Sequence, residues 1–214
     1  MSKLKLEISM SVDGYIAGPN ATRDEPLGVG GEKLHEWGVR LASWQEEHGY
    51  DSSQGDTGTD DDVMAEASRS HGAVIMGKRM FCGEDGPWGD EPFKGWWGDD
   101  PPFKKPVFVL THHEREPLEL GETRFEFVTD GIESALEQAR DAAGDQDVQI
   151  SGGADVAQQY LAAGLIDEMQ IHIAPVLLGG GVRLFDGELD GPRDLRITRA
   201  IESPGVTHVR YEAA

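Results

Sequence analysis

The chain has 214 residues, of which 38% are hydrophobic, and a formal net charge of -21. This length is enough for one domain with a sizeable core, and the hydrophobic content argues against disorder. Forty acidic residues against nineteen basic ones argue against binding to a nucleic-acid backbone, because its phosphates would be repelled. We therefore expect a single domain over residues 1–214 that does not bind nucleic acid.

The cysteine content and the start of the chain point to a soluble, cytoplasmic protein. Cys82 is the single cysteine, so no internal disulfide can form and no cysteine set for zinc is present. Apolar and polar residues alternate over 4–10, which is unlike the continuous apolar stretch of a signal peptide. No segment approaches the ~20 apolar residues of a membrane helix. We expect neither a metal site nor a membrane partner.

The first third of the chain alternates strand and helix patterns. The alternation over 4–10 predicts a strand with one buried face, ended by Asp13 and Gly14. Apolar residues three and four apart predict an amphipathic helix over 32–47. An acidic loop over 48–60 then leads into a helix that ends near residue 70, and the Thr-Asp-Asp-Asp sequence of 59–62 can cap it.

The remaining elements follow in the same alternation. Residues 72–77, 107–110, 124–128, 147–151 and 169–176 predict strands, while 131–143 and 154–163 predict helices. The segment 83–105 holds five glycines, four prolines and three tryptophans, which is typical of a long functional loop. A hairpin around Pro204-Gly205 closes the chain. The sequence thus predicts an α/β fold whose mixed, mostly parallel sheet is flanked by helices and ends in an antiparallel C-terminal hairpin.

Two glycine-containing segments at strand ends are suited to phosphate. In residues 150–156, Gly152 and Gly153 lie between a strand and a helix, where the backbone can approach a pyrophosphate closely and the helix N-terminus is partly positive. A tight strand-to-helix turn is the alternative. Residues 76–80 repeat the design, and Lys78 and Arg79 there are conspicuous in so acidic a chain. Simple surface charge is the alternative for these two cations.

A third strand end supplies hydrogen-bonding side chains. Thr111, His112 and His113 offer a hydroxyl and two imidazoles to a monophosphate such as the 2′-phosphate of NADP. A metal is less suited, because adjacent ligands on a strand point to opposite faces. Three anion-binding strand ends together indicate a dinucleotide cleft. The G-x-G-x-x-G fingerprint of a Rossmann site is absent, so another cofactor fold is expected.

Five segments in order along the chain carry a resemblance to a known family. They are Ser9-Met-Ser-Val-Asp-Gly-Tyr-Ile-Ala-Gly18, Val74-Ile-Met-Gly-Lys-Arg-Met80, Val107-Phe-Val-Leu-Thr111, Ser151-Gly-Gly-Ala-Asp155 and Ile173-Ala-Pro-Val-Leu-Leu-Gly179. The chain resembles the dihydrofolate-reductase-like family, in particular single-domain proteins related to the reductase domain of riboflavin biosynthesis. The resemblance implies a three-layer fold, a homodimer, and hydride transfer from NADPH to a small pterin-like, pyrimidine or carbonyl substrate.

The resemblance also implies a set of site residues. The cofactor-binding residues would be Ser9, Ile16, Ala17, Gly77, Lys78, Arg79, Met80, Leu110, Thr111, His112, Ser151, Gly152, Gly153, Ala154, Asp155 and Val156. In this set, Ser9, Ile16 and Ala17 would line the nicotinamide. Asp13 is the acidic residue nearest the expected cleft and is the candidate catalytic proton donor, with a turn-forming role beside Gly14 as the alternative.

Two departures from the family pattern bear on the substrate. Ser151 stands where riboflavin-pathway reductases usually carry an acidic residue, and none of the four acidic residues in the predicted 32–47 helix lies in a recognisable folate-reductase motif. Neither familiar substrate is therefore assigned. A non-catalytic NADP-binding or ligand-sensing module, which needs no proton donor, is the alternative function, and a purely structural interaction protein would bind no NADPH.

The excess of acidic residues suggests a salt-rich cytoplasm, with an ordinary acidic protein as the alternative. Molar salt shortens the screening distance to about 3 Å and so removes most repulsion between exposed carboxylates. We expect the thermal unfolding midpoint to rise between dilute buffer and molar salt. Calorimetry in the two solutions checks this, and an unchanged midpoint would favour the ordinary acidic protein.

Overall fold

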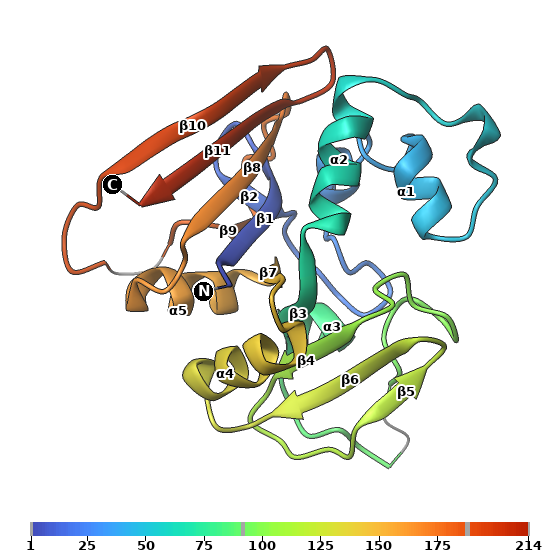
Figure 1. The fold of residues 1–214 in the computed structure, drawn as a ribbon, viewed down its shortest axis with the longest axis vertical. Helices are drawn as coiled ribbons and strands as arrows, with labels where there is room; N and C mark the ends of the chain where they lie inside the picture. Colours follow the sequence, from blue (N-terminus) through green and yellow to red (C-terminus); the bar gives the residue numbers. More distant parts are fainter. Residues whose placement is uncertain (1, 91–92, 187–188, 214) are drawn as a thin grey trace.

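A nine-stranded sheet organises the computed structural model, which describes residues 2–90, 93–186 and 189–213 (Figure 1). Its strand order is β10-β11-β8-β1-β7-β3-β4-β6-β5. The strands are β1 (Leu4–Ser11), β3 (His71–Gly77), β4 (Pro106–Leu110), β5 (Leu118–Leu120), β6 (Thr123–Val128), β7 (Asp147–Gly152), β8 (Glu168–Ala174), β10 (Leu195–Glu202) and β11 (Thr207–Ala213). The run from β8 to β6 is parallel and the C-terminal hairpin β10-β11 is antiparallel, which confirms the predicted mixed sheet.

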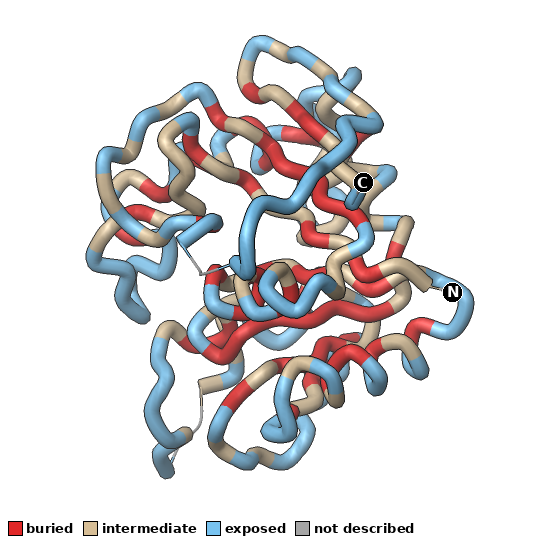
Figure 2. The backbone as a smooth tube through the Cα atoms, turned by 90° about the vertical axis from the view of Figure 1, so that its left-hand side faces the viewer, coloured by how far each residue is buried: buried red, intermediate tan, exposed pale blue. Residues whose placement is uncertain are grey.

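Helices lie on both faces of this sheet. They are α1 (Ala42–Glu47), α2 (Thr59–Arg69), α3 (Lys78–Cys82), α4 (Ile132–Ala143) and α5 (Ala154–Ala163), with 3-10 turns η1 (Gly31–Leu34) and η2 (Ser52–Gln54). Side chains of α4 and α5, such as Leu136 and Tyr160, pack with Leu4, Leu6 and Ile150 in the main apolar core. Figure 2 shows the buried residues gathered along the central strands and the exposed ones in the surrounding loops.

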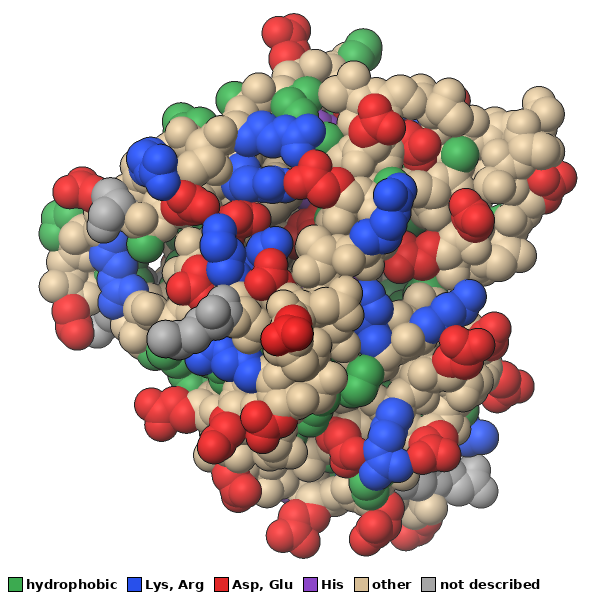
Figure 3. Space-filling view, in the orientation of Figure 1, with side chains coloured by type: hydrophobic (Ala, Val, Ile, Leu, Met, Phe, Trp, Pro, Cys, Tyr) green, Lys and Arg blue, Asp and Glu red, His purple; other side chains and the backbone are tan. Residues whose placement is uncertain are grey.

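The face opposite α4 and α5 is polar where β1, β8 and β11 lie side by side. This polar layer consists of Lys5, Glu7, Ser9, Glu168, Gln170, His172, His208 and Arg210. Its charges are paired: Lys5 lies 2.6 Å from Asp147, and Arg210 contacts Glu66 on α2 at 2.8 Å. Figure 3 shows Lys and Arg side chains beside Asp and Glu over this part of the molecule. The strict alternation along β1 therefore separates an apolar face from a charged one.

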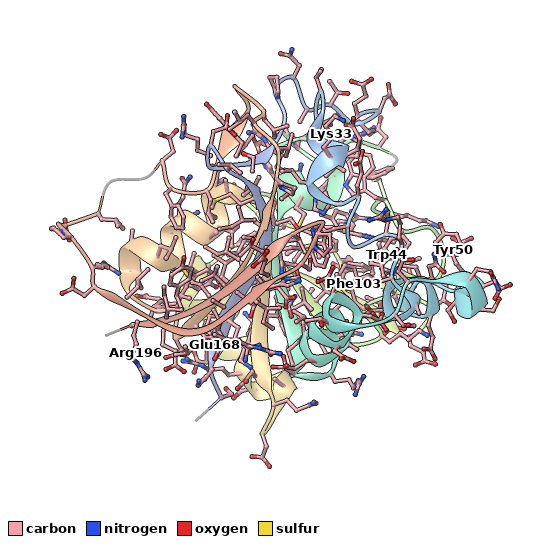
Figure 4. The ribbon with its side chains drawn as sticks, turned by 90° about the horizontal axis from the view of Figure 1, so that it is seen from above. Lys33, Trp44, Tyr50, Phe103, Glu168 and Arg196 are labelled. Carbon is pink, nitrogen blue, oxygen red and sulfur yellow. The ribbon has the colours of Figure 1, made fainter. Side chains whose placement is uncertain are left out.

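The predicted helix over 32–47 is wrong. The segment forms η1, a series of turns through Gly38, and then the short helix α1. Leu41 is extended and bridges to Asp56, while Ala42 N-H donates to the Asp56 carbonyl, so a pairing with a distant segment interrupts the helix. The apolar side chains are buried as the spacing suggested, except that Trp44 is partly buried and stacks on Tyr50 at the projecting end of the molecule (Figure 4).

Other local predictions are refined by the structure. The helix near residues 59–70 is confirmed as α2, but its N-cap is Gly58, which has no side chain to cap it. The Asp61 carboxylate accepts from Ser43 N. Three short strands were not predicted: β5 in the large sheet, and β2 (Tyr15–Ala17), which pairs with β9 (Val182–Arg183). None of the helices in the described part of the chain has the length and apolar character needed to cross a membrane.

The long loop after Gly83 packs as a second core instead of an open lid. Its described residues contribute Trp88, Phe93, Trp97 and Phe103, which pack on Phe81 and Phe125 among others. Trp88 meets Phe81 edge to face at 6.0 Å between ring centroids, and its indole N-H donates to the His113 carbonyl. We call this cluster on the β4-β6-β5 side the aromatic core. It is separate from the main core under α4 and α5.

A buried hydroxyl ties α5 to the start of α4. Tyr160 is fully buried and its hydroxyl donates to the Ile132 carbonyl at 2.7 Å. Burial raises the pKa of Tyr160, so this group remains a donor at working pH. We expect Tyr160→Phe to lower the free energy of unfolding by about 1 kcal/mol, measured by urea denaturation. Tyr50→Phe, at an exposed position, is the control, and equal effects of the two substitutions would contradict this assignment.

Candidate functional site

The C-terminal ends of the parallel strands bring the three predicted loops to one edge of the sheet. Met76 on β3 is in register with Gly152 on β7, and Gly77 is in register with Leu110 on β4. β1 lies on the other side of β7. Neighbouring strands are spaced by about 4.8 Å, so the loops after β1, β7, β3 and β4 follow one another over roughly 14 Å. This edge is where open α/β sheets bind their ligands.

The Gly152-Gly153 turn leaves open space beside the N-terminus of α5. Gly153 is the N-cap residue, its φ of -79° is accessible to any residue, and a Cβ placed on it would meet no atom within 4 Å. The peptide bond between the two glycines is cis. The first N-H groups of a helix lack partners within the helix and carry partial positive charge. Backbone and open space together make a cradle for an anion, with the exposed carboxylate of Asp155 beside it.

The second glycine loop touches the first. A Cβ on Gly77 would lie 2.9 Å from Val156 Cγ2 and 3.7 Å from Gly153 N, so the glycine allows β3 to approach α5. On the other side, a Cβ on Gly152 would lie 3.1 Å from Met80 Sδ. The structure therefore brings together Gly77, Met80, Gly152, Gly153 and Val156. Ser151 and Ala154 flank the same turn.

The two cations predicted for this site are held by the following loop. Lys78 is buried, and its Nζ donates to the Glu84 carbonyl at 2.9 Å and lies 4.3 Å from the centre of the Trp88 ring. Arg79 is exposed and pairs with Asp85. Both side chains bind the 84–88 segment. The backbone of residues 77–80, and not the Lys78 ammonium group, therefore faces Gly152-Gly153.

At the end of β4, Thr111 closes a local turn. Thr111 is buried, and its Oγ1 accepts the His113 N-H at 3.1 Å. His112 is exposed beside it, and Leu110 is half-buried. This strand end offers one solvent-facing imidazole to a ligand, at the far end of the edge from β1.

At the other end of the edge, Ser9 lies on β1 against a tryptophan. Ser9 is 7% exposed, and its Oγ accepts the indole N-H of Trp37 at 3.2 Å. Ile16 and Ala17 lie on β2, which leaves the end of β1 and pairs with β9. The Ala17 carbonyl lies so close to Gly181 that a Cβ on Gly181 would collide with it. The three residues predicted for the nicotinamide thus share the end of β1.

Asp13 is engaged by the loop after β8. Its two carboxylate oxygens accept from Leu178 N at 3.1 Å and from Gly179 N at 2.7 Å. Hydrogen bonds from Ser11, and then from Gly179 and Leu178, lower the pKa of Asp13. A carboxylate that stays ionised at neutral pH is a poor proton donor, so these contacts favour the turn-forming alternative.

A cavity of about 290 Å³ lies beside the end of β1 and was not predicted from the sequence. It is lined by Lys33, Glu36, Trp37, Arg40, Pro175, Val176 and Gly205. Val176 joins it to β1, because its carbonyl accepts the Val12 N-H at 3.0 Å. Lys33 and Arg40, two cations seven residues apart in an acidic chain, are the sequence signal that could have indicated it.

The cavity wall carries two cations, Lys33 and Arg40, and one carboxylate, Glu36. Among the described residues, Lys33 has no carboxylate within ion-pair distance, and Arg40 has only the exposed Asp56 at 3.8 Å. Figure 4 shows Lys33 on the opposite side of the molecule from Glu168 and Arg196 of the charged region around β8 and β10. The described residues contain no group of three or more His, Cys, Asp or Glu side chains arranged for a metal ion.

The sequence of the chain matches one protein family over nearly its whole length. Residues 2–204 match the family described as the RibD C-terminal domain. The chain belongs to this family. The membership confirms the resemblance predicted from the five segments, and with it the assignment to the oxidoreductases. No curated protein matches the chain.

Solved structures of low sequence identity share the fold. A putative riboflavin biosynthesis protein from Shewanella sp. PV-4 is 24% identical, with 99% of each chain covered and a TM-score of 0.62. RibD from Acinetobacter baumannii is 18% identical, with a TM-score of 0.59 over all of this chain and 58% of that one. A pyrimidine reductase-like protein from Corynebacterium diphtheriae is 14% identical, with a TM-score of 0.55 over all of this chain and 92% of that one. The fold is therefore dihydrofolate-reductase-like, as predicted.

The open space at Gly153 gives a direct test of the cradle. We expect Gly153→Ala to weaken NADPH binding at least tenfold, or about 1.4 kcal/mol, because its methyl group would occupy the space left for the pyrophosphate without colliding with the protein. Titration of NADPH fluorescence measures the affinity. Gly86→Ala is the matched control, since its Cβ also meets nothing within 4 Å. Equal affinities for the two variants would remove the pyrophosphate from this turn.

Proposed function

We propose that the chain is an NADPH-dependent reductase that transfers a hydride to a small planar heterocycle of the pyrimidine class or to a related carbonyl compound. The observation that carries the proposal is the order along one sheet edge: His112, the two glycine turns, Ser9, and then a cation-lined cavity. Family membership supports it. A bifunctional deaminase and 5-amino-6-(5-phosphoribosylamino)uracil reductase from Thermotoga maritima shares the fold at 15% identity and a TM-score of 0.53, although this chain spans only 57% of it.

The residues of the edge fit an extended dinucleotide. The α5 N-terminus and the backbone at Gly77 and Gly153 would hold the pyrophosphate. Thr111 and His112 would hold the 2′-phosphate, and Ser9 with Ile16 and Ala17 would line the nicotinamide. When bound, NADPH supplies the hydride, and the protein aligns the two reactants.

The cavity beside Ser9 would take the hydride acceptor. Its volume is near the lower end of small-molecule pockets, which are typically about 300–1,000 Å³. The wall holds Lys33 and Arg40 against the single carboxylate of Glu36, and this net positive lining favours an acceptor with an anionic group, such as a phosphate ester. Because the cavity and Ser9 share Trp37, the acceptor would lie next to the nicotinamide end of the cofactor.

The alternative is a non-catalytic NADP-binding or ligand-sensing module. The observation in its favour is the lowered pKa of Asp13, which leaves the predicted proton donor ionised. Both functions require NADPH binding. They differ in whether NADPH is consumed when an acceptor is present.

The localisation and the assembly remain predictions. Cytoplasmic localisation and a homodimer are expected from the sequence and from the family resemblance. β8 is an internal strand between β1 and β11, so its edges are not available to a second copy of the chain. β10 and β5 are the outer strands of the sheet, and Leu195 and Ile197 on β10 are exposed, so β10 is a better candidate for the contact.

We expect NADPH oxidation with at least one acceptor from a panel of phosphorylated and unphosphorylated ribosylaminopyrimidines, pterins, dihydrofolate and quinones. For a phosphorylated acceptor, the double substitution Lys33→Gln, Arg40→Gln should raise KM at least tenfold and leave NADPH affinity unchanged, because these cations would contact the acceptor and not the cofactor. Absorbance at the NADPH band follows turnover.

The control removes the same charge elsewhere. Arg69→Gln with Lys94→Gln changes two exposed cations outside the cavity. If both double variants raise KM equally, the cavity does not bind the acceptor. Tight NADPH binding without turnover on any acceptor would favour the sensing module, and absence of NADPH binding would overturn both functions.

A further inference from the structure

Two buried histidines face each other beneath the candidate site. His172 on β8 and His208 on β11 are paired across the two strands, and they are 2% and 1% exposed. Their Nδ1 atoms lie 2.6 Å apart. His172 Nε2 lies 3.1 Å from a Glu7 carboxylate oxygen, and His208 Nε2 lies 3.0 Å from one of Asp60. We call the four side chains Glu7, His172, His208 and Asp60 the histidine relay.

The geometry fixes how many protons the relay holds. Ionised carboxylates only accept hydrogen bonds, so each Nε2 must carry a hydrogen. The contact between the two Nδ1 atoms also needs one hydrogen, because two lone pairs would repel and two N-H groups would collide. The two rings therefore share three protons. With two carboxylates and one imidazolium, the relay has a net charge of -1.

The surroundings of the relay act on the pKa of its histidine on β11. Burial lowers the pKa of His208, the hydrogen bond with Asp60 opposes this shift, and the neighbouring His172 adds to it. Burial and His172 also lower the pKa of His35, and burial with Lys105 lowers that of His71 to about 4. The groups beside the relay are His35 from the C-cap of η1, His71 on β3, Lys5 on β1, Arg210 on β11, and the Ser203 hydroxyl, which donates to Asp60. Lys5 and Arg210 are cationic but pair with Asp147 and Glu66, so Glu7 and Asp60 remain to balance the imidazolium.

A metal ion does not account for the arrangement. Nitrogen ligands at about 2.0 Å around a tetrahedral ion lie about 3.3 Å from each other. The Nδ1 atoms here are closer than that. The short separation fits a hydrogen bond with a shared proton.

Trp37 connects the relay to the candidate site. Its ring centroid lies 4.8 Å from that of His172 and 5.1 Å from that of His208. An indole attracts a cation through the negative face of its ring. The same side chain donates to Ser9 and lines the cavity proposed for the acceptor. Trp37 and Ser9, which is the β1 partner of His172, thus lie between the shared proton and the proposed ligand sites.

We propose that the histidine relay is a proton-dependent positioning device: its shared proton holds Trp37 against Ser9, and loss of that proton at high pH weakens ligand binding at the site. Without the proton, either the two Nδ1 lone pairs or an Nε2 lone pair and a carboxylate oxygen face each other, so one of the three contacts must open. Trp37 packs on both rings and must follow. The proton count stands on the relay alone, whereas the effect on ligands rests on the proposed function.

The first experiment counts the protons in the full chain without ligand. Nitrogen-15 NMR of histidine-labelled protein near neutral pH should show two Nε2 atoms that are both protonated and one hydrogen coupled to both Nδ1 atoms. His172→Gln and His208→Gln assign the signals by their loss. Two neutral rings without a hydrogen between the Nδ1 atoms would overturn the relay as described.

The second experiment tests the effect on the site through NADPH affinity as a function of pH. Asp60→Asn removes a charge that holds the shared proton, so affinity should fall at least fivefold at pH 8 relative to wild type and remain equal at pH 6. Glu7→Gln should act in the same direction and replaces Asp60→Asn if that variant does not fold. Asp62→Asn, an exposed carboxylate in the same first turn of α2, is the control.

The outcomes separate the two proposals. If Asp60→Asn and Glu7→Gln have the same pH profile as Asp62→Asn, the relay does not position the site. If the wild type binds no NADPH at any pH, the proposed function fails and so does the role of the relay in it, while the NMR result still decides the shared proton.

Discussion

The structure depends on covering both faces of a parallel sheet. Parallel strands are seldom left open to water on either side. Here α4 and α5 cover one face with aliphatic packing, whereas the opposite face of β1, β8 and β11 carries charged and hydrogen-bonding side chains that are paired with each other and with α2. A buried polar layer is tolerated only when its members find partners. Specific pairs such as His208 with Asp60 therefore fix where α2 and the hairpin can lie.

The same sheet explains why binding groups from distant parts of the chain meet. Since the strands from β8 to β6 run in one direction, the loops after β1, β7, β3 and β4 emerge at a common edge. Glycine at positions 77 and 153 then decides how close these loops come to each other and to a ligand. Backbone groups therefore supply most of the possible contacts to an anion, which is consistent with the small number of Lys and Arg side chains in this acidic chain.

Local sequence patterns predicted much of this arrangement, whereas the parts that depend on long-range contacts were not predicted. The apolar run before Gly77 and the glycine pair before α5 predicted their strands and turns, because each depends on neighbours in sequence. The helix over 32–47 failed because Leu41 pairs with Asp56, which periodicity does not reveal. The sequence predicted the Lys78 ammonium group at the phosphate, but Trp88 and the Glu84 carbonyl bind it instead. His172 and His208 are 36 residues apart, so only strand pairing could join them.

The two ends of the sheet edge rest on different cores, although β3, β4 and β6 contribute side chains to both. Regions with their own packed side chains open in proteins as distinct cooperative units. Phe81 of α3 belongs to the aromatic core, whereas Leu4 and Leu6 of β1 and Val156 of α5 belong to the main core. A dinucleotide lying along the whole edge would bridge both units and couple their opening. Its binding would then stabilise the contact between the two parts of the fold, and the protein without the dinucleotide would open more readily.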